Sequence, residues 1–189
     1  TQVKPPKPQI DASKTIGLDL GIQDFAVTST GEKISNPRTL KRVLGKLKFI
    51  QRKYSKYKGK RTKKKLALLH EKVSNKRHDF LHQLTKKLVV ENQTIALEDL
   101  NVKGMIQNHC LAQAIQDVSW GKFNELLAYK AVWYGCNLLR IGRFEPSSKT
   151  SDCGYVHKDL TLKDRVWTCP QCGNFYDRDI QAAKNIKKF

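Results

Sequence analysis

The stretch Thr168–Ile186, TCPQCGNFYDRDIQAAKNI, constrains this chain most, because it joins two chemically distinct features within a few residues. The CPQC turn at 169–172 has the spacing of a metal-binding knuckle, and Gly173 supplies the tight turn. Asp177–Asp179, the tripeptide DRD, follows directly and leads into a short helical run from about Ile180. A metal-binding turn is thus tied to a candidate catalytic carboxylate, whose partners the rest of the chain must supply.

The charge of the chain is one-sided: 36 Lys and Arg stand against 17 Asp and Glu in 189 residues, a formal net charge of +19. Such a charge predicts a polyanionic partner, foremost nucleic acid. The sequence has no long apolar stretch and no signal peptide, so we expect a cytoplasmic, nucleoid-associated protein and no membrane partner. Five cysteines without an export signal favour metal binding over a disulfide framework.

A long basic region follows the first strands. Residues 41–65 hold 13 Lys and Arg and no acid, and the apolar spacing on either side predicts a helical hairpin at about 40–90 with a basic crest. A run of one sign favours phosphate contact over a merely solvated surface. The expected nucleic-acid contacts are Lys58, Lys60, Arg61, Lys63, Lys64 and Lys65.

The segment 15–30 predicts a pair of strands, with a third near 33–35. Ile16 and Leu18 alternate with Gly17 and Asp19, which places a carboxylate in the middle of an apolar strand. Burying an unpaired carboxylate is costly, so a metal ion would explain Asp19, although a turn or capping role is the alternative.

Further elements complete an α/β pattern. We expect a strand at 94–100 with Glu98 on the face opposite Ile95 and Leu97, an amphipathic helix at 117–134 whose aromatic residues include a core Trp133, and a strand at 136–141. Cys110 and Cys136 are interpreted as small buried apolar residues. This order predicts a mixed sheet flanked by helices.

Two constellations emerge. Asp19, Glu98 and Asp179 are three hard oxygen ligands suited to two Mg²⁺ or Mn²⁺ ions, which about 4 Å apart can support phosphodiester hydrolysis. Asp177 is the alternative to Asp179, but it can also cap the last helix.

The second constellation is Cys153, Cys169 and Cys172, which could bind Zn²⁺. Counting back from Cys153, Thr150 stands where a partner cysteine would complete a second CxxC pair. The fourth ligand is therefore open, with His157 or Asp152 as the candidates.

These residues resemble a known family. GLDLGIQDFAVTSTGEKI, ALEDLNVKGM, FEPSSKTSDCGY, KDRVWTCPQCG and YDRDIQAAKNI occur in the order found in the C-terminal half of the TnpB transposon-encoded nucleases, relatives of the type V CRISPR effectors. The resemblance implies a RuvC-like nuclease of RNase H fold with an inserted zinc ribbon, and it matches Asp19, Glu98 and Asp179 to the catalytic carboxylates. It further implies a guide RNA and a DNA substrate.

The chain departs from the family pattern in three ways. One ribbon cysteine is missing, Gln181 stands where the pattern has Asn, and the N-terminal portion that holds the guide RNA is absent. We accordingly divide the chain into 1–14, a linker or tail of a missing N-terminal portion; 15–146, the nuclease core; 147–175, a zinc-ribbon-like element; and 176–189, the last RuvC segment. The expected function is that of a metal-dependent, RNA-guided DNA endonuclease domain; the alternative is a nuclease-inactive nucleic-acid-binding remnant or regulator.

Overall fold

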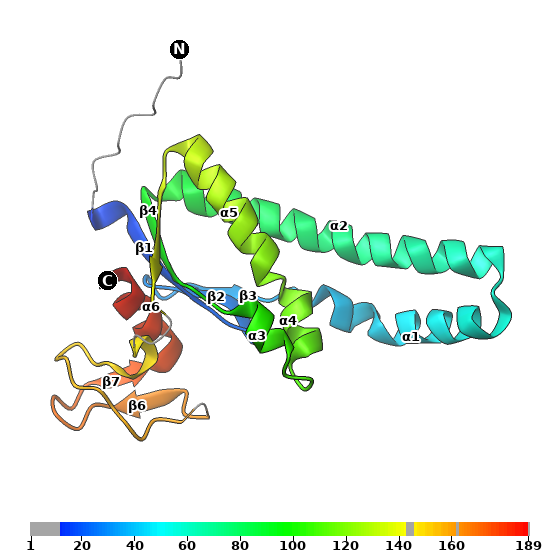
Figure 1. Ribbon diagram of the computed structural model, residues 1–189. Coiled ribbons are helices and arrows are strands. Elements are labelled where there is room, and N and C mark those ends of the chain that lie inside the picture. Colours follow the sequence, from blue (N-terminus) through cyan, green and yellow to red (C-terminus); the bar gives the residue numbers. More distant parts are fainter. Residues whose placement is uncertain (1–11, 143–145, 162, 189) are drawn as a thin grey trace, which may run out of the picture.

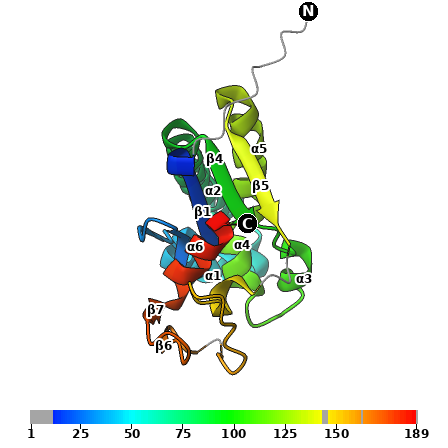
Figure 2. The ribbon, with the colours of Figure 1, turned by 90° about the vertical axis from the view of Figure 1, so that its left-hand side faces the viewer.

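A mixed β-sheet forms the centre of the computed structural model, which describes residues 12–142, 146–161 and 163–188. Within these residues the sheet has five strands in the order β3-β2-β1-β4-β5, seen from two directions in Figures 1 and 2. Strand β2 is antiparallel to both β1 and β3, whereas β1, β4 and β5 are parallel. The sheet strands are β1 Thr15–Leu20, β2 Asp24–Thr28, β3 Lys33–Ser35, β4 Thr94–Glu98 and β5 Asn137–Ile141. The helices are α1 Thr39–Tyr57, α2 Lys60–Glu91, α3 Val102–Ile106, α4 Ala112–Val118, α5 Trp120–Tyr134 and α6 Arg178–Lys188, with short 3-10 turns η1 Ala12–Lys14 and η2 Ser147–Lys149.

Helices cover both faces of this sheet. The alternation predicted for the first strand is confirmed, because Ile16 and Leu18 are buried in the main core with residues of α2 and α5 such as Leu81 and Phe123. Helix α6 packs on the opposite face of β1 and β4, where Ile186 joins a smaller core cluster. The molecule is therefore an α/β domain of helix, sheet and helix layers.

The contact between α6 and β1 depends on Gly17. A Cβ atom at this position would collide with the carbonyl oxygen of Ala183 and lie 2.7 Å from the backbone nitrogen of Lys187. Only a glycine allows the helix to approach this closely, so Gly17 sets the position of α6 over the sheet.

The predicted helical hairpin is present. Helices α1 and α2 pack together through Leu47, Ile50 and Leu69, and they extend away from the sheet in Figure 1. The N-terminal amides of α1 at Leu40 and Lys41 donate to the carboxylate of Asp117, at 3.0–3.4 Å. A side chain distant in sequence thus caps the helix and fixes the hairpin to α4.

The prediction of one continuous helix at 117–134 is wrong, because the segment belongs to two helices, α4 and α5. Ser119 adopts a left-handed conformation with φ of 58° and separates α4 from α5. Trp120 and Phe123 are buried as predicted, whereas Trp133 is 75% exposed. The interpretation of Cys110 as a buried residue is also wrong, because its thiol is exposed. Cys136 is half-buried. Hydrophobic spacing alone did not register the break at Ser119 or the end of the packed face.

A small antiparallel pair, β6 Val166–Thr168 with β7 Phe175–Asp177, lies below the sheet and has its own cluster of buried residues, including Trp167 and Tyr176. Of the segment expected to be a linker, residues 1–11 lie outside the described residues and Ala12–Lys14 form η1. In the part of the chain that the structure describes, no helix is both long and apolar enough to cross a membrane.

Candidate active site

Asp19 and Glu98 lie side by side at the carboxyl ends of β1 and β4. The register pairs Leu18 with Leu97, so the next residue on each strand of this parallel pair is one of the two acids. Both follow a residue that points into the main core, so both carboxylates face the side of the sheet that α6 covers. The sequence separates these two residues widely, and the parallel pairing brings them together.

Asp179 joins them from the first turn of α6. The carboxylate of Asp177 accepts hydrogen bonds from the backbone amides of Asp179 and Ile180, at 3.1 and 3.2 Å, and it also pairs with Lys33 at 2.7 Å. Asp177 is therefore the capping residue, which was one of its two expected roles. Asp179 is thus not the residue that caps the helix.

These three carboxylates line one cavity of about 450 Å³, here named the catalytic cavity. Its wall also contains the loop 20–24, Leu111, Ser147, Arg165 and Arg178. A volume of this size is typical of pockets that take part of a substrate. The lining of the cavity thus combines acidic groups with two arginines.

The electrostatics of the cavity indicate a place for cations. Burial, together with the charges of Glu98 and Asp179, raises the pKa of Asp19 to about 8, although Arg178 and Arg165 oppose this effect. Burial is the largest cause of this raised pKa, and the two neighbouring carboxylates add to it, so a cation beside Asp19 would stabilise its ionised form. The three carboxylates together are a donor set that fits hard divalent ions such as Mg²⁺ or Mn²⁺.

Three further residues of the cavity were not predicted from the sequence. The hydroxyl of Ser147 donates to Glu98 Oε1 at 2.5 Å, and Arg165 Nη1 lies 3.3 Å from a carboxylate oxygen of Asp179. Arg178 is buried and donates to the carbonyl of Thr161 at 2.8 Å. All three lie within the motifs FEPSSKTSDCGY, KDRVWTCPQCG and YDRDIQAAKNI, but no residue pattern pointed to their contacts with the carboxylates.

Helix α6 also holds the loop that carries Ser147. The side-chain amide of Asn185 donates to the carbonyls of Ser147 and Thr150, each at 2.7 Å. Gln181, one turn earlier, donates to the Thr150 carbonyl and to Asp152 at 3.2 Å. The last helix therefore supplies Asp179 and also fixes the segment that contacts Glu98.

The three expected cysteine ligands lie together. The thiol sulfurs of Cys153, Cys169 and Cys172 are all within 4.8 Å of one another. Burial raises the pKa of the Cys169 thiol, but hydrogen bonds from Ser151 and from backbone amides outweigh it and lower the pKa to about 6. The thiolate is the form that binds Zn²⁺, so a cysteine that ionises readily suits a zinc site.

Neither sequence-based candidate for the fourth ligand belongs to this group of three cysteines. His157 is outside the cluster and packs edge-on against Trp167, with ring centroids 5.6 Å apart. Asp152 pairs with Lys188 at 2.8 Å. The Ser151 hydroxyl instead lies 2.9 Å from the sulfur of Cys153. Counting residues back from Cys153 places Thr150 where the family has its missing cysteine. The Thr150 hydroxyl, however, donates to the carbonyl of Pro146.

The six basic residues predicted to contact nucleic acid surround the turn between α1 and α2. They are exposed and occupy the end of the hairpin farthest from the sheet. The hairpin therefore presents its positive charge far from the catalytic cavity. The residues are Lys58, Lys60, Arg61, Lys63, Lys64 and Lys65.

The fold, with three carboxylates gathered at the ends of β1, β4 and the start of α6, defines an RNase H-like domain of the RuvC type. Two solved structures share it. They are titled "Cryo-EM structure of the Cas12f1-sgRNA-target DNA complex" (TM-score 0.68, 18% identity, 95% of this chain and 51% of the other) and "Cryo-EM structure of CRISPR-Cas12f Ternary Complex" (TM-score 0.72, 17% identity, 98% and 40%).

Sequence comparison names the family. Residues 1–109 match the OrfB_IS605 family model, described as "Probable transposase", and residues 120–186 match the Cas12f1-like TNB domain. The chain belongs to the OrfB_IS605, or TnpB-like, family.

Two relatives illustrate the relationship. A protein of Streptomyces pristinaespiralis named "Putative RNA-guided DNA endonuclease" is 44% identical over 90% of this chain. "TnpB-like protein L79" of Acanthamoeba polyphaga mimivirus is 26% identical over 97% of it. The chain spans 44% and 39% of the lengths of these two relatives.

Proposed function

We propose that this chain is the DNA-cleaving domain of an RNA-guided endonuclease, which hydrolyses phosphodiester bonds in its catalytic cavity. The observation that carries the proposal is the convergence of Asp19, Glu98 and Asp179 from β1, β4 and α6 on one cavity. In the whole protein, a guide RNA held largely by other parts of the molecule would select the DNA.

The three carboxylates would hold two Mg²⁺ or Mn²⁺ ions. Such ions activate a water molecule for attack on phosphorus and stabilise the departing oxygen. The residues of the chain serve this chemistry by position. Ser147 fixes the orientation of Glu98, and α6, capped by Asp177, fixes Asp179. Because no side chain needs to attack the phosphate, a covalent protein intermediate is unnecessary.

Arg165 and Arg178 would act on the substrate side of the cavity. Arg165 is 58% exposed beside Asp179, so its guanidinium can reach a phosphate without leaving the cavity wall. Arg178 is tied to the carbonyl of Thr161 and contributes a fixed positive charge. A guanidinium suits phosphate because it presents several donors in one plane.

The basic hairpin and the cysteine cluster would have supporting roles. The six exposed cations at the α1–α2 turn would contact phosphates without reading sequence, which predicts binding that weakens steeply with salt. The cysteine cluster would bind Zn²⁺ and hold β6 and β7 together next to Arg165.

The test is cleavage of end-labelled single-stranded DNA in the presence of Mg²⁺ or Mn²⁺. Glu98→Ala is compared with Glu125→Ala, a matched substitution of an exposed acid that pairs with Lys122. Loss of cleavage in Glu98→Ala and in Asp19→Ala, with retention in Glu125→Ala, is the expected result. Full cleavage by the Asp19→Ala chain would show that the carboxylates are not catalytic.

The second candidate is a nucleic-acid-binding protein that does not cut, and the incomplete set of cysteines favours it. It predicts that the unaltered chain binds DNA in a salt-sensitive way and does not cleave it with either Mg²⁺ or Mn²⁺. Repeating the assay with the remaining portion of the protein and its guide RNA separates this candidate from a domain that needs its targeting half.

A further inference from the structure

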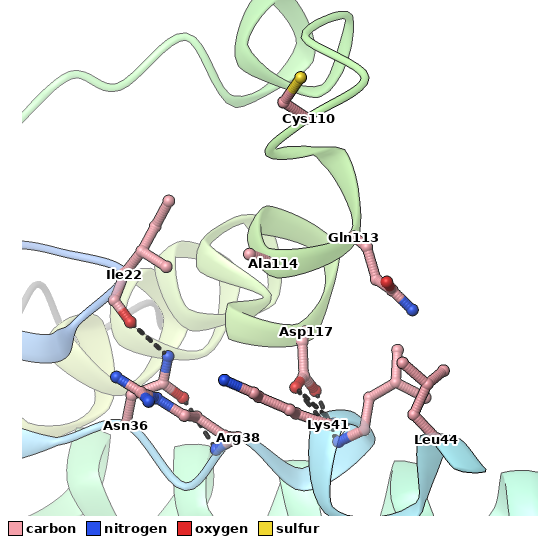
Figure 3. Close-up of a pocket in the computed structure, with 10 residues that line it drawn as sticks. Ile22, Asn36, Arg38, Lys41, Leu44, Cys110, Gln113, Ala114 and Asp117 are labelled. Carbon is pink, nitrogen blue, oxygen red and sulfur yellow. Dashed lines mark hydrogen bonds between the residues drawn. The ribbon is translucent and has the colours of Figure 1, made fainter.

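A second cavity lies next to the catalytic cavity. It has a volume of about 410 Å³ and is here named the side cavity; Figure 3 shows its lining. Ile22 lines both cavities; in addition, Cys110 lines the side cavity while its neighbour Leu111 lines the catalytic cavity. The two spaces are therefore adjacent, with Ile22 on their common border.

The side cavity carries uncompensated positive charge. Arg38 and Lys41 line it and are both exposed. The acid in its lining, Asp117, accepts hydrogen bonds from the first amides of α1 and from Arg77 at 3.0 Å. These donors already occupy the carboxylate, so Asp117 does not neutralise Arg38 or Lys41. What remains available to a ligand is cationic, which suits a phosphate group.

Arg38 is held in place by unusual geometry. Its backbone is left-handed, with φ and ψ of 46°, a conformation that a residue with a side chain rarely adopts. Its guanidinium donates to the carbonyl of Gln23 at 3.3 Å, and Asn36 donates to the carbonyl of Ile22 at 2.8 Å. These bonds attach the side cavity to the loop that forms a wall of the catalytic cavity.

The border between the cavities is apolar. Ile22 is partly buried against the main core, and Leu111 is 43% exposed. An apolar surface between two charged spaces is suited to the face of a nucleic-acid base, with phosphates on either side. The side cavity also opens at the start of α1, the helix that leads to the basic crest.

We propose that a single strand of nucleic acid runs from the catalytic cavity across Ile22 into the side cavity, where Arg38 and Lys41 contact its phosphates. This proposal rests on the proposed function, because it assigns a path to the strand that is cut. It makes Arg38 and Lys41 positioning residues, which hold the strand and do not touch the reacting atoms.

The first test uses Cys110, an exposed thiol in the side cavity. The Asp19→Ala chain, which leaves the strand uncut, is alkylated with iodoacetamide in the presence and absence of oligothymidylate, and each cysteine is followed by mass spectrometry. The strand should slow alkylation of Cys110 about tenfold once binding is near saturation, while Cys153, an exposed thiol that does not line the side cavity, serves as the internal reference. Unchanged alkylation of Cys110 at saturating DNA would overturn the proposal.

The second test compares two pairs of substitutions with equal loss of charge. Arg38→Gln with Lys41→Gln should reduce the salt slope of single-strand binding by about 1.4, roughly 0.7 for each phosphate contact, and should abolish the protection of Cys110. Lys86→Gln with Lys184→Gln, both exposed on other surfaces, should preserve that protection. Equal effects of the two pairs would refute the assigned path.

The two proposals fail separately. Protection of Cys110 without any metal-dependent cleavage, also when a targeting portion and guide RNA are supplied, would refute the proposed function and leave the strand-binding path standing. Cleavage that depends on Asp19, without protection of Cys110, would do the reverse.

Discussion

Asp19 and Glu98 occupy equivalent positions at the carboxyl ends of two parallel, hydrogen-bonded strands, and burial and the charge of Glu98 are the two largest causes that raise the pKa of Asp19 to about 8. The acids are close because of strand pairing and not because of a local motif. Their mutual repulsion is therefore built into the sheet, and a cation is what relieves it.

The first prediction concerns stability and pH. The pKa of Asp19 is about 8 in the folded, metal-free chain and 3.8 as its ordinary value, so the folded state retains a proton that the unfolded state loses. The free energy of unfolding therefore decreases as pH rises from about 4 to about 8. Asp19→Asn should remove this decrease and raise the melting temperature of the metal-free chain more at pH 8 than at pH 5.

The same proton competes with the metal. Below pH 8, Mn²⁺ must displace it, so apparent Mn²⁺ affinity should increase up to about tenfold per pH unit between pH 6 and 8 and level off above. Calorimetric titration at several pH values measures this dependence. A flat profile for the unaltered chain would contradict the assigned pKa, and Asp19→Asn is expected to bind Mn²⁺ weakly at every pH.

The second prediction concerns the approach of α6 to the sheet. Gly17→Ala places a methyl group against the carbonyl of Ala183, so α6 and Asp179 must move. We expect a loss of about 3 kcal/mol in the free energy of unfolding, measured by urea denaturation, together with weaker metal binding. The control is Gly45→Ala, in open space on α1, which should stabilise the chain by about 1 kcal/mol. A neutral Gly17→Ala would mean that α6 sits farther from β1.

The third prediction concerns the loop that contacts Glu98. Asn185→Ala removes the donor to the carbonyls of Ser147 and Thr150. The Thr150 carbonyl keeps its bond from Gln181, so the main loss is at the buried Ser147 carbonyl, at a cost of about 1–3 kcal/mol. Hydrogen exchange should increase in residues 147–161. Lys184→Ala, an exposed neighbour on the same helix, should change neither quantity; similar exchange in both variants would show that Asn185 does not hold the loop.

The fourth prediction concerns the fourth position of the cysteine cluster. The Ser151 hydroxyl already lies 2.9 Å from the sulfur of Cys153, so Ser151→Cys should complete four thiolates and tighten Zn²⁺ binding roughly tenfold or more. Thr150→Cys is the matched comparison, because the Thr150 side chain bonds to Pro146 instead. Competition against a chromogenic chelator measures both, and tighter binding by Thr150→Cys alone would favour the position obtained by counting residues.

Local patterns predicted much of the fold correctly. The alternation of Ile16 and Leu18 with Gly17 and Asp19 fixed both the strand and the face of its carboxylate, because side chains on a strand alternate with a period of two. The hairpin of α1 and α2 was predicted for a similar reason, since its apolar stripe is long and regular. Trp133 and the break at Ser119 were missed, because neither burial nor a left-handed residue follows from spacing alone.

The sequence by itself determined the α/β class, the basic hairpin, the cysteine residues that cluster and two of the three acids, Asp19 and Glu98, since each rests on residue type and local spacing. The tertiary structure decided which groups meet. Parallel pairing placed Asp19 beside Glu98, capping by Asp177 left Asp179 facing the cavity, and folding of the loop at 147–153 brought Ser151 rather than Thr150 to Cys153. Ser147, Arg165 and the side cavity arise from contacts between segments distant in sequence. Such contacts depend on the packing of whole elements, which no short pattern encodes.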